Sequence, residues 1–192
     1  LIALGLSIGF KANIWNIGAE GQYIMGAIFG ASFALYFYPL ESNFIFPLMI
    51  LIGIIGGSLW SMIPAILKVR FNVNEILVSL MLVYVAEQIL ALASLGFLRN
   101  PDGAGFPGSR NLSQYSSASN SELIMGTGIH LGVLLSLLMV VFFYVLLFQH
   151  SLGFKIKLLG NSPRASGFSG DNPNKIIFLC LILCGGLAGL AG

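Results

Sequence analysis

Long and nearly continuous runs of apolar residues dominate the chain, and shorter polar connections separate them. The runs approach the roughly 20 residues that a helix needs to cross a bilayer. They lack the period-two alternation of a transmembrane β-strand. The six stretches occupy residues 1–10, 22–39, 44–67, 76–98, 129–149 and 175–192. This pattern predicts an all-α, polytopic helical membrane protein.

The composition excludes other classes of protein. The chain is 57% hydrophobic and only 8% charged, with a mean hydropathy of +0.92. An average soluble domain is about 25% charged, so a soluble enzyme and a disordered chain are both excluded. A net charge of +2 is too small for the basic stripe of a nucleic-acid-binding protein. We therefore expect no nucleic-acid partner.

We expect residues 1–192 to form a single transmembrane domain that is truncated at both ends. The first stretch, residues 1–10, has the character of the tail of an apolar segment, and the last stretch stops at Gly192 within another. Whether residues 1–10 cross the membrane completely stays open, and the number of crossings depends on it.

The distribution of Lys and Arg predicts the orientation, because cytoplasmic loops carry an excess of these residues. If every stretch crosses once, the connections 11–21, 68–75 and 150–174 share one side. With the boundary at residue 175, they hold seven of the nine cations: Lys11, Lys68, Arg70, Lys155, Lys157, Arg164 and Lys175. This predicts a cytoplasmic loop at 150–174 and an extracytoplasmic loop at 99–128.

No catalytic signature is present, so we do not expect an enzyme. The chain has no nucleotide-binding glycine loop, no His-Glu-x-x-His zinc motif and no Gly-x-Ser-x-Gly nucleophile. We expect no metal site, since His130 and His150 lie at opposite ends of one apolar stretch. Cys180 and Cys184 are one helical turn apart and are interpreted as small packing residues.

The first candidate feature is a carboxylate between two glycines, with amide side chains on both sides. Glu20 lies between Gly18 and Gly21, and Asn16 and Gln22 flank them. Glycine lets the backbone leave helical geometry. One interpretation is a broken helix that presents Asn16, Glu20 and Gln22 to a solute path. The other is an ordinary interfacial loop with Glu20 at the start of the next helix. The residue types at 16–22 do not decide between these two interpretations.

The second feature is a polar face on the helix predicted over 76–98. Asn74 and Glu75 are a typical helix start, which explains them structurally. Tyr84, Glu87, Gln88 and Ala91 share one face of the helix that follows. Glu87 lies about 18 Å along the helix from Glu75, within the hydrocarbon, where a carboxylate is costly. Glu87 is a candidate functional residue, with a structural hydrogen bond to a neighbouring helix as the alternative.

The third feature is a basic, amphipathic segment within residues 150–174. A turn is predicted at Gly160–Ser162, and Ser162 followed by Pro163 predicts the start of a short helix that ends at Gly167 or Gly170. Such a segment fits a lipid-surface anchor or a helix that docks into a partner. Its spacing does not decide between them.

Four segments taken together resemble a known family. They are Asn-Ile-Gly-Ala-Glu-Gly-Gln at 16–22, Asn-Glu-Ile-Leu-Val-Ser-Leu-Met-Leu-Val-Tyr at 74–84, the stretch 153–165, and Gly-Gly-Leu-Ala-Gly-Leu-Ala-Gly at 185–192. In this order they resemble the permease subunits of bacterial ABC importers, in the branched-chain amino acid and simple-sugar permease superfamily. The nucleoside-type branch is the most similar, since the monosaccharide branch usually has Ile-Asp-Leu-Ser-Val-Gly where this chain has residues 17–22.

The resemblance implies a permease subunit of an ATP-driven importer for nucleosides or related sugar-containing solutes, in the bacterial plasma (inner) membrane. It implies three partners: a cytoplasmic ATP-binding-cassette subunit, a second permease subunit (identical or different), and an extracytoplasmic substrate-binding protein. No cofactor is expected in this chain, because ATP is bound by the partner. The alternative is an ATP-independent secondary transporter or channel in which Glu20 or Glu87 carries a proton.

Two sets of residues follow as candidates. The solute-path residues, chosen because polar solutes need hydrogen-bonding groups in an apolar tunnel, are Asn16, Glu20, Gln22, Tyr84, Glu87 and Gln88. The coupling residues, which match the family pattern for contact with the ATPase, are Gly153, Phe154, Gly160, Asn161, Pro163, Arg164 and Ala165. The chain departs from that pattern over 166–171, where an additional glycine weakens the predicted short helix.

Overall fold

The computed structural model describes residues 1–192 except 39, 101–107, 113–114, 121 and 125. The helices are α1 (Ile2–Lys11), α2 (Ala19–Tyr36), α3 (Ile45–Phe71), α4 (Glu75–Leu95), α5 (Leu131–Phe148), α6 (Ser151–Asn161), α7 (Pro163–Phe168) and α8 (Pro173–Ala191). A small antiparallel hairpin pairs β1 (Glu122–Ile124) with β2 (Ile129–His130). Each predicted apolar stretch contains a helix, and the all-α fold is confirmed. The hairpin was not predicted.

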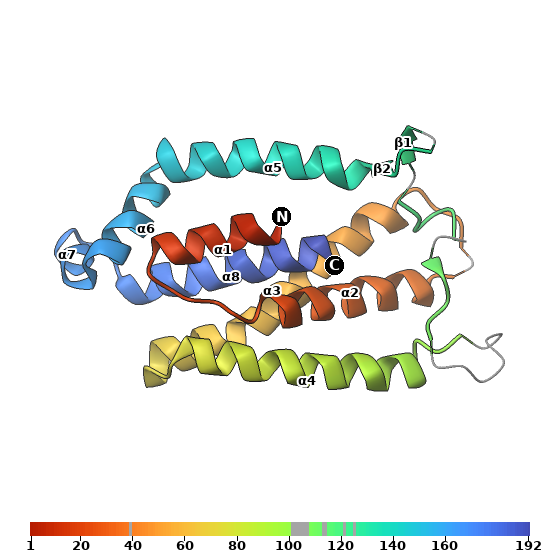
Figure 1. Ribbon diagram of the computed structural model, residues 1–192, viewed down its shortest axis with the longest axis horizontal. Helices are drawn as coiled ribbons and strands as arrows, with labels where there is room; N and C mark the ends of the chain where they lie inside the picture. The colour runs from red at the N-terminus through yellow and green to blue at the C-terminus, as the bar shows by residue number, and fades with distance from the viewer. Residues whose placement is uncertain (39, 101–107, 113–114, 121, 125) are drawn as a thin grey trace.

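The helices form an elongated bundle (Figure 1). α6 and α7 lie at one end, and the hairpin lies at the other. Within the described residues, α3, α4, α5 and α8 are long and apolar enough to cross a membrane. α1 has only 10 residues, and α2 is not among the four. In Figure 1, α1 covers the half of the bundle nearer α7, and α2 covers the other half. In the described part of the chain, only four of the six predicted stretches therefore contain a helix that could cross a membrane by its length and hydropathy alone.

The centre of the bundle is a crossing of glycine-rich surfaces on α2, α3 and α8. A Cβ on Gly57 of α3 would lie 2.3 Å from the carbonyl oxygen of Gly185 on α8. A Cβ on Gly26 of α2 would lie 2.4 Å from the Cα of Gly189. The helices therefore touch backbone to backbone. Small residues permit this close approach, which is a main source of helix association in lipid.

The connection between α2 and α3 is held by the segment that follows α4. The Tyr115 hydroxyl donates to the carbonyl oxygens of Phe37, at 3.2 Å, and Leu40. The backbone N–H of Ser42 donates to the Ser117 hydroxyl at 3.1 Å. The described part of the loop 99–128 thus packs against the end of the bundle opposite α7. That this end is extracytoplasmic stays a prediction.

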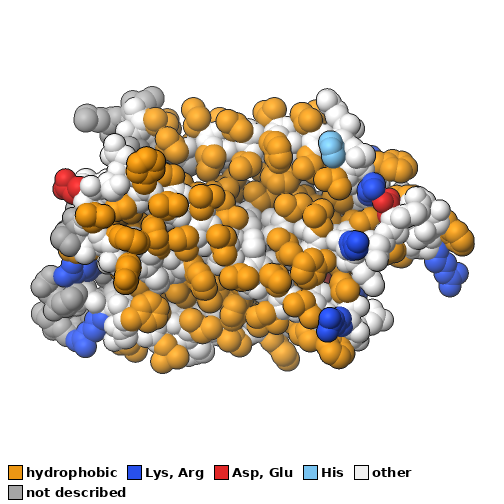
Figure 2. Space-filling model, turned by 180° about the vertical axis from the view of Figure 1, so that it is seen from behind, with side chains coloured by type: hydrophobic (Ala, Val, Ile, Leu, Met, Phe, Trp, Pro, Cys, Tyr) orange, Lys and Arg blue, Asp and Glu red, His pale blue; other side chains and the backbone are white. Residues whose placement is uncertain are grey.

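The seven Lys and Arg residues that the sequence assigns to one side of the membrane lie at one end of the bundle. Figure 2 shows a broad hydrophobic band on the side of the molecule, with Lys and Arg side chains toward its two ends. The seven grouped cations lie in the last turns of α1 and α3, in α6 and α7, and in the first turn of α8, which meet at one end of the bundle. An apolar side wall between polar ends is the surface of a protein that spans a membrane.

Candidate functional site

The connection between α1 and α2, residues 12–18, returns into the bundle. In Figure 1 it leaves the end of α1 beside α6 and runs back to near the middle of the bundle, where α2 begins. Asn13 takes the left-handed conformation, with φ 56°, at the point where the chain turns back. The break therefore lies inside the bundle and not in a loop at its end. This geometry favours the broken-helix interpretation, with Glu20 in the first turn of the helix that starts inside the bundle.

Asn16 and Gln22 form a closed pair of amides at this break. The Asn16 amide donates to Gln22 Oε1 at 3.0 Å, and the Gln22 amide donates to Asn16 Oδ1 at 3.3 Å. Asn16 Oδ1 also accepts from the backbone N–H of Gly18 at 3.0 Å. The two residues are only 2% and 1% exposed. In this conformation the two amides stabilise the connection, and neither presents a free group to a solute.

The start of α2 packs against the N-terminal half of α4. The backbone N–H of Ile17 donates to the Ser79 hydroxyl at 3.2 Å. A Cβ on Gly18 would lie 2.7 Å from the Ser79 carbonyl oxygen, and one on Gly21 would lie 3.0 Å from the Cα of Val83. Sequence reasoning missed the role of Ser79. The available signal was its spacing, because Ser79, Val83 and Ala86 lie on one face of α4.

The remaining solute-path residues lie on the outside of this seam. Glu20, Tyr84, Glu87 and Gln88 are all exposed, with Tyr84 at 61%. Among the described residues, neither the Glu20 nor the Glu87 carboxylate has a hydrogen-bond or ion-pair partner. The alternative of a structural hydrogen bond for Glu87 is therefore not realised within this part of the chain. The structure separates the six residues into a buried amide pair and four exposed side chains.

Glu75 behaves as its position at the helix start predicts. Its carboxylate is buried and lies 2.7 Å from the Lys68 ammonium at the end of α3. Asn74 accepts from the backbone N–H of Ile76 at 2.9 Å and caps α4. Asn72 takes the left-handed conformation, φ 51°, in the turn between the two helices. These residues stabilise the α3–α4 connection.

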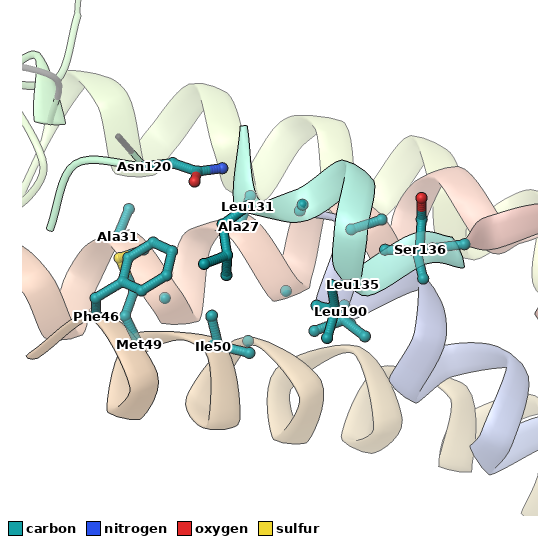
Figure 3. Close-up of a pocket in the computed structure, with 18 of the residues that line it drawn as sticks. Ala27, Ala31, Phe46, Met49, Ile50, Asn120, Leu131, Leu135, Ser136 and Leu190 are labelled. Atoms are coloured by element: carbon teal, nitrogen blue, oxygen red, sulfur yellow. The ribbon is translucent and has the colours of Figure 1, made fainter. Parts of the chain in front are cut away.

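A separate hollow lies in another part of the bundle. A cavity of about 780 Å³ opens between the first turns of α5 and the helices α1, α2, α3 and α8 (Figure 3). Its wall is mostly small and apolar, as in Ala27, Ala31 and Ile50, with Asn120 and Ser136 among the few polar residues. None of the six solute-path residues lines it.

The coupling segment, residues 150–174, folds as two helices. Gly153 and Gly160 are close-packing positions in α6. A Cβ on Gly153 would lie 2.3 Å from the Leu147 carbonyl oxygen, and one on Gly160 would lie 2.1 Å from the Lys11 carbonyl oxygen. α6 therefore rests directly on the last residue of α1, which precedes the connection to α2. Phe154 is exposed on the other side of α6.

α7 starts where the sequence predicts. Ser162 caps it by accepting from the Ala165 N–H at 3.3 Å, and Pro163 is its first residue. α7 ends at Phe168, between the two glycines expected to end it. The predicted turn at 160–162 is wrong in its first two residues, because α6 continues through Asn161. Asn161, Pro163 and Arg164 are exposed, and Ala165 is half-buried.

Sequence reasoning missed two features of the coupling segment. Phe168, at the end of α7, is 93% exposed. The Lys155 ammonium lies 2.5 Å from the Asp171 carboxylate and links α6 to the chain that follows α7. An aromatic residue in the predicted short helix was a signal for the first feature, but no spacing rule connects residues 155 and 171.

The cysteines have the predicted packing role. Both are buried and free, and Cys184 Sγ donates to the Gly5 carbonyl oxygen at 2.8 Å. The described residues contain no group of three or more His, Cys, Asp or Glu side chains that could hold a metal ion.

These features define a multi-pass helical membrane protein with a break between two helices inside the bundle and a basic helical segment at one end. Over residues 1–192 the chain matches the family described as branched-chain amino acid transport system / permease component. The chain belongs to this family of transporter permeases.

Several curated proteins are similar over the whole chain. The glucose ABC transporter permease protein TsgB13 of Haloferax volcanii is 30% identical, and the match covers 100% of this chain and 52% of that protein. The nucleoside ABC transporter permease protein NupB of Lactococcus lactis is 28% identical, covering 100% and 54%. The guanosine ABC transporter permease protein NupP of Bacillus subtilis is 28% identical, covering 100% and 55%. The chain thus spans about half the length of these relatives. No solved structure matches.

Proposed function

We propose that this protein is a membrane-spanning permease subunit of an ATP-driven importer for nucleosides or related sugar-containing solutes. The observation that carries the proposal is the break between α1 and α2 inside the bundle, where α2 starts against α4 and carries Glu20 in its first turn. Family membership supports the permease role. The names of the similar proteins, one for glucose and two for nucleosides, support a solute that contains a sugar.

The solute path runs along the exposed polar surface of the α2–α4 seam. Glu20, Tyr84, Glu87 and Gln88 supply acceptors and donors for the hydroxyl groups of a sugar ring. An unpaired carboxylate is costly in lipid, so this surface needs a cover that is polar or hydrated. A second permease subunit, identical or different, supplies that cover. Asn16 and Gln22 fix the backbone that carries Glu20.

The coupling segment transmits movement from a cytoplasmic ATP-binding-cassette subunit. The exposed α7 docks into that subunit, and α6 connects α7 to α1 through the close contact of Gly160 with the Lys11 carbonyl. α1 leads directly into the broken connection beside Glu20. A displacement of α7 can therefore reach the path through packed helices and select between two arrangements with unequal solute affinity.

The orientation follows from the cation count. The end with α6 and α7 is cytoplasmic by the positive-inside rule, and a substrate-binding protein delivers the solute at the opposite end, which carries the loop 99–128. The membrane is the bacterial plasma (inner) membrane. This subunit hydrolyses no ATP and needs no cofactor of its own.

The test is uptake of labelled nucleosides by vesicles that contain the full-length permease and its ATPase. We expect ATP-dependent uptake that unlabelled nucleoside inhibits and ribose does not. Glu20→Gln or Glu87→Gln should reduce uptake by about tenfold, since a hydrogen bond to a charged group contributes about 1–1.5 kcal/mol more than one to a neutral amide. Glu41→Gln, an exposed carboxylate in the α2–α3 connection, is the matched control.

Other outcomes would overturn parts of this proposal. Inhibition of nucleoside uptake by unlabelled ribose or glucose would indicate that the transported solutes are free sugars. The unpartnered carboxylates Glu20 and Glu87 also fit proton-coupled transport. Uptake that proceeds without ATP and collapses with the proton gradient would therefore identify a secondary transporter in place of an ABC importer.

A further inference from the structure

One ion pair closes the loop that contains α7. The Lys155 ammonium, on α6, lies 2.5 Å from Asp171 Oδ1, in the connection from α7 to α8. Asp171 Oδ2 also accepts from the Ser169 hydroxyl at 3.4 Å, at the end of α7. A single carboxylate therefore contacts both the helix before α7 and the residue that ends α7. The Asp171 side chain is only 19% exposed, so the pair is partly shielded from solvent.

α7 has few other restraints. It has six residues, of which only Ser166 is buried. Gly167 lies inside it, and a Cβ at this position would have no neighbour within 4 Å; a glycine inside a helix also weakens it. The buried Ser166 hydroxyl has no hydrogen-bond partner among the described residues. The Ser162 side chain caps the start of α7. The contacts of Asp171 hold its end.

We propose that Lys155 and Asp171 are a positioning pair that fixes the orientation of α7 relative to α6, so that movement of α7 is passed on to α1. The proposal rests on the coupling role given to α7 above. Without the pair, α7 can rotate at Gly167, within the helix, and at Gly170, just after it, while α6 stays in place. ATP hydrolysis then continues without an equal amount of transport. Lys155 and Asp171 act through α7 and need not touch the ATPase.

The chain offers a matched control on the same helix. Lys157 lies two residues after Lys155, is exposed, and has no ion-pair partner among the described residues. Its nearest aromatic contact is the Phe148 ring, 5.6 Å from the ammonium. Lys157→Met removes the same charge from α6 as Lys155→Met does, but it leaves the link to Asp171 intact.

The first measurement is hydrogen exchange of the backbone amides of residues 164–170 in the purified full-length protein. We expect faster exchange in Lys155→Met and Asp171→Asn, by about two- to fivefold as for a partly exposed ion pair, and no change in Lys157→Met. Equal exchange in all variants would overturn the proposal. The double variant Lys155→Asp/Asp171→Lys restores opposite charges and should exchange more slowly than either single variant.

The second measurement is the ratio of ATP hydrolysed to solute transported by the reconstituted transporter. We expect this ratio to rise in the two single variants and to stay at the wild-type value in Lys157→Met. Faster exchange with an unchanged ratio would overturn the positioning role. If the wild-type protein instead shows no ATP-dependent uptake, the importer itself fails, and the exchange measurement still decides whether the pair holds α7.

Discussion

The crossing of α3 and α8 can be tested at Gly57. In Gly57→Ala, the added Cβ would lie 2.3 Å from the Gly185 carbonyl oxygen and 2.7 Å from the Gly189 Cα. Both atoms belong to backbone, so no flexible side chain can move aside. To reach an ordinary contact of 3.4 Å or more, the two helices must separate by about 1 Å.

The free-energy cost of separating α3 and α8 by about 1 Å can be estimated from the contacts that are lost. A gap of about 1 Å gives up a quarter to a half of the dispersion attraction along the seam, and overpacking of this kind costs about 1–3 kcal/mol. Alanine has the higher helix propensity and offsets at most about 1 kcal/mol. Because both clashing atoms are backbone, the cost falls in the upper part of that range, about 2–3 kcal/mol. Subtracting about 1 kcal/mol for helix propensity leaves a net loss of about 1–2 kcal/mol. For a chain of this size, this loss corresponds to a fall of about 2–8 °C in the unfolding midpoint.

The buried cysteines provide the assay. The chain has two cysteines, Cys180 and Cys184, and both are free, buried in α8 and at most 2% exposed. A thiol-reactive fluorescent maleimide therefore reports unfolding of the α8 region when the detergent-purified protein is heated. We expect Gly57→Ala to label at lower temperature than wild type. Gly132→Ala is the control, since its nearest neighbour would be 3.8 Å away. An unchanged midpoint in Gly57→Ala would refute the backbone-contact argument.

The same thermal assay tests two other sites. Asn16→Ala leaves the buried Gln22 amide without its partner and should cost about 1–3 kcal/mol; a midpoint equal to wild type would contradict the closed amide pair. Lys68→Met should destabilise more than the double variant Lys68→Met/Glu75→Gln, because only the single variant leaves a buried carboxylate unpaired; the opposite order would exclude a buried pair. Tyr115→Phe removes a hydroxyl that bonds two backbone carbonyls. It should speed limited proteolysis of the loop 99–128, and an unchanged rate would argue that the loop is held elsewhere.

The sequence predicted the helices because their signals are local. Length and continuous apolar character define a membrane helix, and α3, α5 and α8 follow their predicted stretches to within a few residues. The start of α7 was predicted because Ser162 and Pro163 act through hydrogen bonds and sterics within one turn. The hairpin of β1 and β2 was missed, since strands of three and two residues have too little pattern to detect.

The site was harder to predict because its geometry depends on contacts far apart in the sequence. A carboxylate flanked by glycines is compatible with a loop at the end of the bundle and with a break inside it. The choice is made by Ser79, which binds the backbone of Ile17, 62 residues away. The pairing of Asn16 with Gln22 could not be predicted from the sequence either, because an amide side chain near a helix start can point inward or outward. The residue types were predictable, but their burial was not.

The break explains why these contacts must be so tight. A backbone that leaves helical geometry at membrane depth has free N–H groups that water cannot reach. Here the groups at Ile17 and Gly18 are bound by the Ser79 hydroxyl and by Asn16 Oδ1. The small residues Gly18 and Gly21 bring α2 close enough to α4 for the first of these bonds to form. The satisfied connection then carries Glu20, whose carboxylate has no partner among the described residues. An exposed carboxylate on a connection whose own N–H groups are bound is the arrangement on which the proposed solute site rests.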